Sequence, residues 1–420
     1  VSGIAGNLFS AALGAVTGGA GGIAGPVTVN QLGSITVYGE NAQAISAPSI
    51  NGGGGSLTFD IQGITDLAGT PLDPSGTLRG TVMAALGSKS TSDANAAAVT
   101  INSVGEQVVV GAGGSGGAVQ SVGGGGGTAY LNLRFSPAVQ SGTGADTLSL
   151  DEIESANMTA AELTPAALPP LPAILPGNVL RRALAADVHV TLAAVDGTYL
   201  DGGDASLTQD GSIIMIGDDS IGQFAQSIGG GGGRQVLALD VTDAAPGALF
   251  ATLGAQNTSN AGGGAVNASQ TGGIFTSGDI APGVLLQSIG GGGGSVGVHL
   301  TAGSQLGAIA DLALGADGGT SLDGGAITAQ YSGGIRTEGN GSTALIAQSI
   351  GAGGGDVRLS GLGANAIALG GIHGATGNGG TVDVVNGGSI VTLGKSSHGV
   401  LLQSIGGGGG AVFGSGLGGV

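Results

Sequence analysis

Residues 403–410 are Gln403-Ser404-Ile405 followed by an unbroken run of glycines. The same element, with Ile or Val in third place and five small residues after it, occurs five times in the chain. The copies are Gln120-Ser121-Val122, Gln226-Ser227-Ile228, Gln287-Ser288-Ile289, Gln348-Ser349-Ile350 and Gln403-Ser404-Ile405. A degenerate sixth copy is Pro48-Ser49-Ile50. Self-similarity over long intervals is the mark of proteins built from stacked units.

A constant frame of glycines surrounds the element. In all six copies a glycine lies eleven residues before the Ile or Val, and a second glycine lies six residues before the first. The glycines nearer the element are Gly39, Gly111, Gly217, Gly278, Gly339 and Gly394. Successive copies are 72, 106, 61, 61 and 55 residues apart, so the frame is constant and the segments between frames vary. Rigid strands joined by variable loops produce this pattern.

The last unit, residues 380–417, predicts β-strands. Residues 381–385, 389–393 and 399–405 are short aliphatic runs separated by Asn, Gly and Ser, and a fourth run begins at Ala411. Such runs are typical of strands, and glycine at this density excludes a stable helix. We therefore predict an all-β fold: a parallel β-helix, or β-solenoid, with Gly-rich turns.

The sequence leaves two coil sizes open. A unit of 55–61 residues makes either about three coils of about 20 residues or a single large coil. Only a single large coil places the Gln-Ser elements directly above one another, where they can form a hydrogen-bonded ladder. Glycine at the corners is expected because it adopts positive φ freely and lets layers approach closely. Five glycines exceed the needs of one turn, and a flexible hinge or an anion-binding nest is the alternative to a structural turn.

Residues 136–185 interrupt the repeat. We expect a short helix over 148–163 and an extended Pro-rich loop over 164–176. The predicted organisation is β-solenoid repeats over 1–135 and 186–420, with this insertion between them. The insertion also carries the basic pair Arg181-Arg182 and is the candidate for lateral contacts between filaments, with a plain cap over the solenoid as the alternative.

Composition excludes several classes of protein. The 420 residues include 95 Gly, 12 Pro and no Cys, and mean hydropathy is +0.39, which excludes a disordered polymer, collagen and a disulfide scaffold. A net charge of −18 with only 9 basic residues argues against binding of nucleic acid or anionic membranes. Residues 3–28 are apolar, but their eight glycines predict no membrane helix. The lack of Cys fits export through an oxidising periplasm.

Catalytic and metal motifs are weak. The histidines, His189, His299, His373 and His398, lack metal-ligand spacing, and the first two are expected to face solvent. Asp-Gly-Gly sequences in 201–204 and 317–325 are similar to Gly/Asp calcium repeats but lack their period. Calcium is therefore the one cofactor that the sequence suggests, and turn-forming Asp is the simpler explanation. Polysaccharide lyases and hydrolases need carboxylates and cations clustered on one face. Arg336 and Arg358 are isolated in the sequence, so we expect no such enzyme.

The two ends of the sequence have nearly the same phase. Residues 415–419 are similar to residues 2–6, and neither end shows a polar cap. An uncapped solenoid exposes unpaired strand edges, so we expect further repeats or another copy of the chain to continue the stack.

The frame from Gly388-Ser389-Ile390 through Gly394 to Ile405 and its glycine run resembles a repeat of very large Gram-negative autotransporter-type proteins. The resemblance covers most of the chain outside about 136–185. It implies export, a passenger β-helix at the cell surface and an adhesive or matrix role. The first hypothesis is a filament or biofilm-matrix protein whose partner is itself; the second is an adhesin for a host or abiotic surface, and the third is a carbohydrate-active enzyme.

Overall fold

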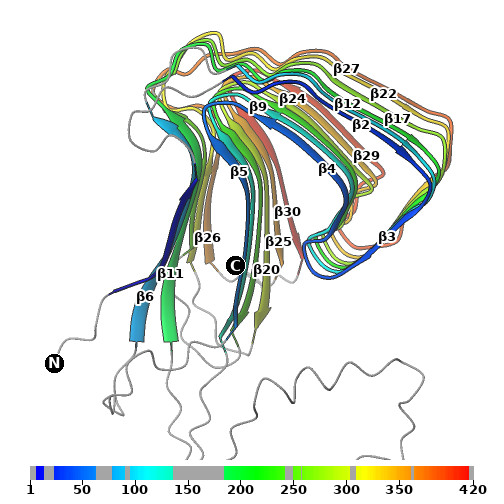
Figure 1. Ribbon diagram of the computed structural model, residues 1–420, viewed down its shortest axis with the longest axis horizontal. Helices are drawn as coiled ribbons and strands as arrows, with labels where there is room; N and C mark the ends of the chain where they lie inside the picture. Colours follow the sequence, from blue (N-terminus) through cyan, green and yellow to red (C-terminus); the bar gives the residue numbers. More distant parts are fainter. Residues whose placement is uncertain are drawn as a thin grey trace, which may run out of the picture.

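The computed structural model describes residues 6–13, 23–62, 78–89, 95–135, 184–241, 249–256, 258–302, 309–360 and 364–415. Within these ranges the only regular elements are β-strands, which pair in parallel into five six-stranded sheets, A to E (Figure 1). The predicted all-β solenoid is therefore confirmed. The helix expected over 148–163 lies outside the described residues.

Each sheet collects one strand from every coil. Sheet A is β1 (Gly6–Leu13), β6 (Leu78–Lys89), β11 (Leu184–Val195), β16 (Leu249–Gln256), β21 (Ile309–Leu314) and β26 (Ala364–Leu369). Sheet B is β2 (Val27–Leu32), β7 (Val99–Val104), β12 (Ala205–Asp210), β17 (Val266–Gln270), β22 (Ile327–Tyr331) and β27 (Val382–Asn386). Sheet C is β3 (Ile35–Tyr38), β8 (Gln107–Val110), β13 (Ile213–Ile216), β18 (Ile274–Ser277), β23 (Ile335–Glu338) and β28 (Ile390–Thr392). Sheet D is β4 (Gln43–Ile50), β9 (Ser115–Val122), β14 (Ile221–Ile228), β19 (Val284–Ile289), β24 (Leu345–Ile350) and β29 (Val400–Ile405). Sheet E is β5 (Gly54–Gln62), β10 (Gly126–Phe135), β15 (Gly232–Val241), β20 (Gly293–Ala302), β25 (Gly354–Ser360) and β30 (Gly409–Ser415).

One repeat unit is one coil. The chain runs through sheets B, C, D, E and A in turn, and β22 then lies beside β17, with Ile327 opposite Val266. The alternative of three small coils per unit is therefore wrong. Successive Gln-Ser elements are direct neighbours, as Gln287 and Gln348 are across β19 and β24.

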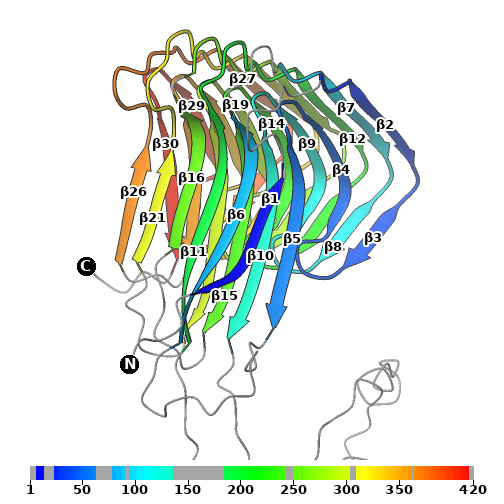
Figure 2. The same cartoon turned by 60° about the vertical axis from the view of Figure 1, so that its left-hand side comes forward.

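The sheets lie in layers around separate cores. In Figure 1, sheets A and E form a two-layered arm, and sheets B, C and D enclose a second compartment; the turned view in Figure 2 shows the strands of each sheet rising side by side. One apolar cluster fills the space between A and E, and a second fills the space enclosed by B, C and D. Sheet D also packs its other face against sheet E, where Phe224 and Phe413 belong to a third cluster.

Burial follows from this layering. In β22, Ile327, Ala329 and Tyr331 are buried while Thr328 and Gln330 face solvent, because sheet B has one covered face. All six residues of β19 are buried, because sheet D is covered on both faces. A strand buried on both faces reads as a nearly continuous apolar run, as the sequence at 284–289 does.

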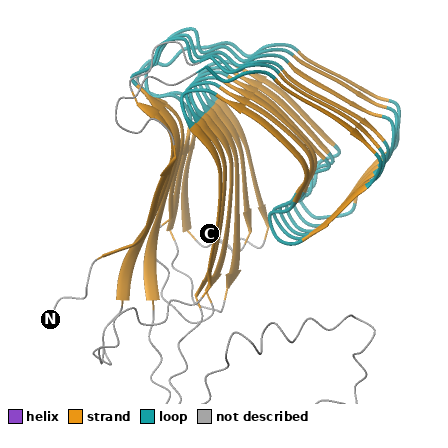
Figure 3. Ribbon diagram, viewed as in Figure 1, coloured by secondary structure: helices purple, strands orange, loops and turns teal. Residues whose placement is uncertain are grey.

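The glycine runs are structural corners, as Figure 3 shows by the loops between sheets D and E. The last two glycines of each run are the first residues of the sheet E strand. Gly293 has φ 132°, and a Cβ built on it would lie 2.0 Å from the carbonyl oxygen of Gly354 in the next coil. Gly294 has φ 135°, and its Cβ would lie 2.0 Å from the carbonyl oxygen of Gly233 in the preceding coil. The run exceeds one turn because the corner continues into two strand positions, where a side chain would meet the backbone of the next or of the preceding coil.

Length variation is concentrated at one edge of the arm. The segments that lead from a sheet E strand to the next sheet A strand are 63–77, 136–183, 242–248, 303–308 and 361–363, all outside the described residues. Strand β11 begins at Leu184, two residues inside the insertion that the sequence predicted at 136–185. The insertion thus replaces a short connection at this edge, and the solenoid continues on both sides of it.

We expect Gly293→Ala to lower the free energy of unfolding by about 2 kcal/mol or more, because the methyl group meets the backbone of the next coil at a positive φ. The matched control is Gly407→Ala, since a Cβ there has nothing within 4 Å and Ala352 occupies the equivalent position one coil earlier with φ 63°. Its cost should stay near about 1 kcal/mol. Urea unfolding of both variants measures the difference, and equal costs would contradict the close-approach explanation.

Candidate functional site

The glutamines of the repeat form a buried ladder between sheets D and E. The Nε2 amide of Gln120 donates to Oε1 of Gln226 over 3.1 Å, and Gln226 donates in turn to Gln287. The ladder continues from Gln287 to Gln348 over 2.8 Å and from Gln348 to Gln403 over 2.7 Å. Each amide donates toward the C-terminal coil, so the ladder has a single direction. A buried amide that bonds to its own equivalent avoids the cost of an unpaired polar group.

The serines of the repeat fasten a different part of the coil. Ser288 Oγ donates to the carbonyl of Gly264 and accepts the N–H of Gly325, both over 2.7 Å. Gly264 and Gly325 belong to the connections that lead from sheet A to sheet B in successive coils. Ser121, Ser227 and Ser349 each make the same pair of bonds. The serine column thus ties these connections to the central sheet.

The remaining repeat residues also align in columns. Val122, Ile228, Ile289 and Ile350 form one buried apolar cluster, with Ile405 packed on it from the last coil. The frame glycines follow the strands of sheet C, and a Cβ on Gly278 would lie 2.3 Å from the carbonyl oxygen of Gly217. The structure therefore brings the repeat residues together along the axis of the stack. The Gln, Ser and Ile or Val columns are buried in the inner coils, whereas the frame glycines are partly exposed.

A buried ionic cluster lies between sheets D and E, and the sequence analysis missed it. Arg358 is isolated in the sequence but fully buried in the structure. Its Nη2 lies 3.2 Å from Oδ1 of Asp219, and its Nε lies 3.0 Å from Oδ2 of Asp356. Arg234, also fully buried, donates to the backbone carbonyls of Gly113 and Asp219 and lies over the rings of Tyr130 and Phe224.

A positional signal for this cluster exists in the sequence. The residue that directly follows each glycine run points between sheets D and E, and in successive coils it is Ser56, Thr128, Arg234, Ser295, Asp356 and Ala411. Aligning the runs would have placed opposite charges in one column. Buried charges of this kind are tolerated only when they are paired.

Three side chains at the edge of the space between sheets D and E, those of Ser360, His299 and Asp218, are of the types found in a hydrolase triad. Ser360 Oγ lies 2.6 Å from Nδ1 of His299, whose Nε2 lies 3.8 Å from Oδ2 of Asp218. His299 was expected to face solvent, but its side chain is only 29% exposed. The second distance exceeds a hydrogen bond. Ser360 is the last residue of β25 and lies opposite His299 and Ser415 in the neighbouring strands.

The acidic turns hold backbone groups. Asp201 Oδ1 accepts the N–H of Gly262 over 2.7 Å, and Asp323 Oδ1 accepts the N–H of Asn378 over 2.6 Å. Within the described ranges no group of three or more His, Cys, Asp or Glu is placed to hold a metal ion. These hydrogen bonds give the two aspartates a turn-stabilising role.

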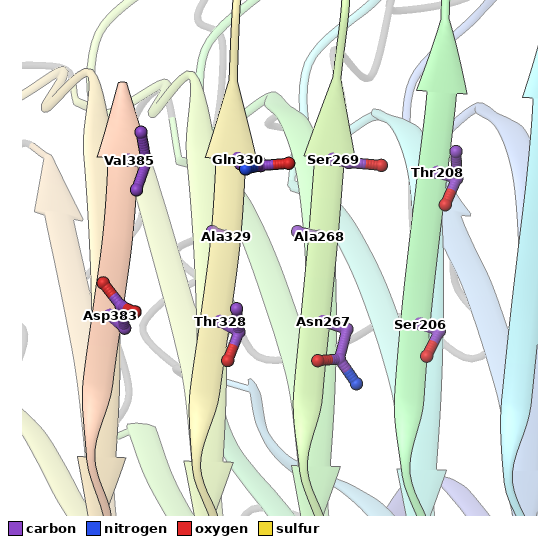
Figure 4. Close-up of a pocket in the computed structure, with 10 residues that line it drawn as sticks. All are labelled: Ser206, Thr208, Asn267, Ala268, Ser269, Thr328, Ala329, Gln330, Asp383 and Val385. Carbon is purple, nitrogen blue, oxygen red and sulfur yellow. The ribbon is translucent and has the colours of Figure 1, made fainter. Parts of the chain in front are cut away.

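A shallow groove of about 330 Å³ crosses the outer face of sheet B (Figure 4). Its lining residues are Ser206, Thr208, Asn267, Ala268, Ser269, Thr328, Ala329, Gln330, Asp383 and Val385. The groove presents short hydroxyl and amide groups in rows and one carboxylate, and none of its lining residues is aromatic. Hydrogen bonding is available along this face, and stacking against a sugar ring is not.

The two ends of the stack are open. The outermost strands are β1 to β5 at one end and β26 to β30 at the other. Val400 and Leu402 in the last coil are 47% and 43% exposed, whereas Leu345 and Ala347, their partners one coil earlier, are 0% exposed. The rows of stacked core residues therefore continue to the end of the stack, and no cap covers them among the described residues.

No helix within the described ranges is long and apolar enough to cross a membrane. Comparison with known proteins yields no match, whether against family models, curated proteins or solved structures. The geometry of the chain is therefore the basis for inferring its role.

We expect Gln287→Leu to destabilise the protein by about 2–4 kcal/mol, because Gln226, Gln348 and Asp356 each lose a buried hydrogen bond to this side chain. Gln403→Leu, at the open end of the ladder, removes one ladder bond and a weak 3.5 Å bond to the carbonyl of Gly410 from a half-buried position, and should cost about 1 kcal/mol. Urea unfolding of the two variants tests the ladder, which would be unsupported if both cost the same.

The buried carboxyls predict a pH dependence. Burial raises the pKa of Asp219 and of Asp356 above the ordinary value of 3.8, and the nearby Arg358 guanidinium opposes this rise by less. The folded protein then binds protons more tightly than the unfolded chain, so these groups reduce stability as pH rises from 3.8 through the raised pKa.

We therefore expect Asp356→Asn to flatten the decline in stability between pH 4 and pH 7, because the variant loses one of these two groups. Asp383→Asn, on the exposed face of sheet B, controls for the loss of one negative charge and should leave the decline unchanged. The measurement is the urea midpoint of unfolding of the wild-type chain and of both variants across this pH range. An unchanged decline in the Asp356 variant would exclude the buried carboxyl as its cause.

Proposed function

We propose that this chain is an extracellular structural protein that assembles end to end, by continuation of its β-solenoid, into a surface filament or biofilm-matrix fibre. The observation that carries the proposal is the pair of open ends. Both ends present the outermost strands of the same five sheets, in the same order, with their core columns exposed.

The hydrogen-bonding groups of the two ends are complementary. Inside the stack, the N–H of Val284 donates to the carbonyl of Ala344, and the N–H of Leu345 donates to the carbonyl of Gly399. Val400 continues this column in the last coil. Its N–H therefore points past the end of the stack, where the first coil of a second copy would supply the acceptor. Unpaired parallel edges are templates for further strands.

Localisation at the surface of a Gram-negative bacterium is part of the same proposal. It is supported by the resemblance of the repeat to autotransporter-type passengers and by a chain without cysteine. Stacked small side chains need no disulfide or metal to hold an exported fibre together. A net charge of −18 favours solubility of the exported chain through mutual repulsion.

An adhesin is the second candidate, and the groove on sheet B favours it. Rows of Ser, Thr and Asn side chains on an exposed flat sheet suit hydrogen bonding to a surface or a polar polymer. The variable segments at the edge of the arm are the other place where a ligand could bind. An adhesin would act as a separate chain, so the state of assembly distinguishes the two candidates.

We expect purified chain to form unbranched filaments that grow with protein concentration, and Val400→Pro to abolish them. Proline removes an N–H that has no backbone acceptor among the described residues, and it places its ring on the stacking edge. The control, Val400→Ala, keeps the N–H and should still assemble. Electron microscopy and sedimentation measure assembly, and circular dichroism verifies the fold. Compact wild-type monomers at all concentrations, or filaments of normal length from the proline variant, would refute end-to-end stacking.

A further inference from the structure

The outer face of sheet C carries two rows of side chains along the stack. Alternate residues of each strand point into the compartment enclosed by sheets B, C and D, and the residues between them point outward. Sheet C lies on the side of this compartment that is turned away from the arm (Figure 1). One outward row is Thr36, Val108, Ile214, Phe275, Arg336 and Val391. The other is Tyr38, Val110, Ile216, Ser277 and Glu338, continued by Leu393 directly after β28. These twelve residues are called the C-face below.

Most of the C-face is apolar and open to solvent. Tyr38 is 76% exposed and Ile216 is 45% exposed, whereas Val109 and Met215, which point inward from the same sheet, are buried. The outer face of sheet B differs, because it presents hydroxyl and amide groups in the same rows. A continuous apolar strip on an otherwise polar molecule marks a surface for contact with another molecule.

The charges of the C-face cancel. Its charged residues are Arg336 and Glu338, which lie on one strand and bond to each other: Nε of Arg336 donates to Oε1 of Glu338 over 2.8 Å. The whole chain has a net charge of −18. A second copy of so acidic a chain can therefore approach this face without meeting the excess of negative charge.

The two rows are complementary to each other. A twofold axis parallel to the stack would bring two C-faces together with each coil opposite the same coil and with the rows exchanged. Arg336 of each copy then faces Glu338 of the other, and Ile214 faces Ile216. A twofold axis along the strands brings each row onto itself, so that Arg336 faces another Arg336 or an uncharged side chain. Only the first arrangement pairs the charges, and it forms the self-complementary type of interface that symmetric dimers use.

The corners beside the C-face fit the same arrangement. Exchange of the rows brings the corner between sheets C and D of one copy beside the corner between sheets B and C of the other. Counted from the middle of each strand, acidic residues of one corner fall opposite uncharged residues of the other. These pairs are Glu40 with Ser34, Glu106 with Ala112, Asp218 with Ser212 and Asp279 with Gly273. Like charges therefore do not meet at either border of the contact.

We infer that two copies of this chain pack side by side through the C-face, about a twofold axis parallel to the stack. Face-to-face packing of sheets whose strands are nearly aligned is a common arrangement. The contact is lateral and independent of end-to-end stacking. Twelve residues from each copy are fewer than the about 20–30 residues a side of a standard interface, so we expect weak dimers whose fraction rises with concentration.

Charge reversal tests the inference. Arg336→Glu gives the C-face two carboxylates and Glu338→Arg gives it two cations, so each variant meets like charges in its own dimer. A mixture of the two variants restores opposite charges at every contact. Asp383→Arg, on the outer face of sheet B, is the control for Glu338→Arg, because it makes the same change in net charge.

All chains carry Val400→Pro so that end contacts do not contribute, and circular dichroism verifies their fold. Sedimentation equilibrium measures the dimer dissociation constant. We expect each reversal to raise this constant at least about tenfold, which corresponds to about 1.4 kcal/mol. The mixture should recover the parent value, and Asp383→Arg should leave it unchanged. If the proline variant does not fold, the same series is measured with Val400→Ala, where end contacts add equally to every sample.

Three results would overturn the lateral dimer. These are monomers of the parent chain at every concentration, equal constants for the parent and the reversed variants, and a mixture that associates no more tightly than either variant alone. None of them bears on end-to-end stacking, which the filaments of the wild-type chain test separately.

Discussion

The spacing between parallel strands governs this molecule. Backbone hydrogen bonding holds neighbouring coils about 4.8 Å apart, so every side chain has its equivalents from the adjacent coils directly above and below it. A residue must therefore be compatible with its own kind. Glutamine satisfies this by donating to glutamine, isoleucine by packing on isoleucine, and glycine by leaving the neighbouring carbonyls unobstructed. The sequence repeats because each residue must fit against its equivalents in the adjacent coils. The constant frame of glycines marks positions where this requirement allows the least variation.

Polar residues are buried in this fold at little cost because the repeat supplies their partners. The serine and glutamine columns are satisfied by groups one coil away. The ionic cluster around Arg358 departs from this rule, since it joins unlike charged residues from two coils and leaves several of its polar atoms without hydrogen bonds. A buried ion pair adds little stability by itself, because removing both charges from water offsets much of their attraction. Here the cluster distinguishes particular coils that the repeat alone would make equivalent.

Much of the fold could be predicted from the spacing of a few residues. The strands expected at 381–385, 389–393 and 399–405 correspond to β27, β28 and β29. The repeat elements lie directly above one another, which is the arrangement expected for a single large coil. Sheet A was missed, because variable segments separate its strands from the frame and remove the constant spacing that identified the others. The size of the coil also could not be derived, since strand length and glycine content are the same for a small coil and a large one.

The site residues divide in the same way. Columns of identical residues, such as Gln287 and Gln348, were visible because they recur at the same position in a constant frame of glycines. Arg358 and Asp219 were not, because residues of different type that meet from different coils look isolated along the chain. The same applies to His299 and Ser360, which lie 61 positions apart and are neighbours across the sheet. Sequence proximity is a poor guide to contact in a protein whose nearest neighbours are one full coil away.

The clustering of variable segments at one edge of the arm has a steric consequence. Adjacent segments leave the solenoid about one strand separation apart, whereas a folded domain of ordinary size is several times wider. Bulky appendages therefore cannot emerge from consecutive coils without crowding. The long segment at 136–183 is followed by the short ones at 242–248 and 303–308.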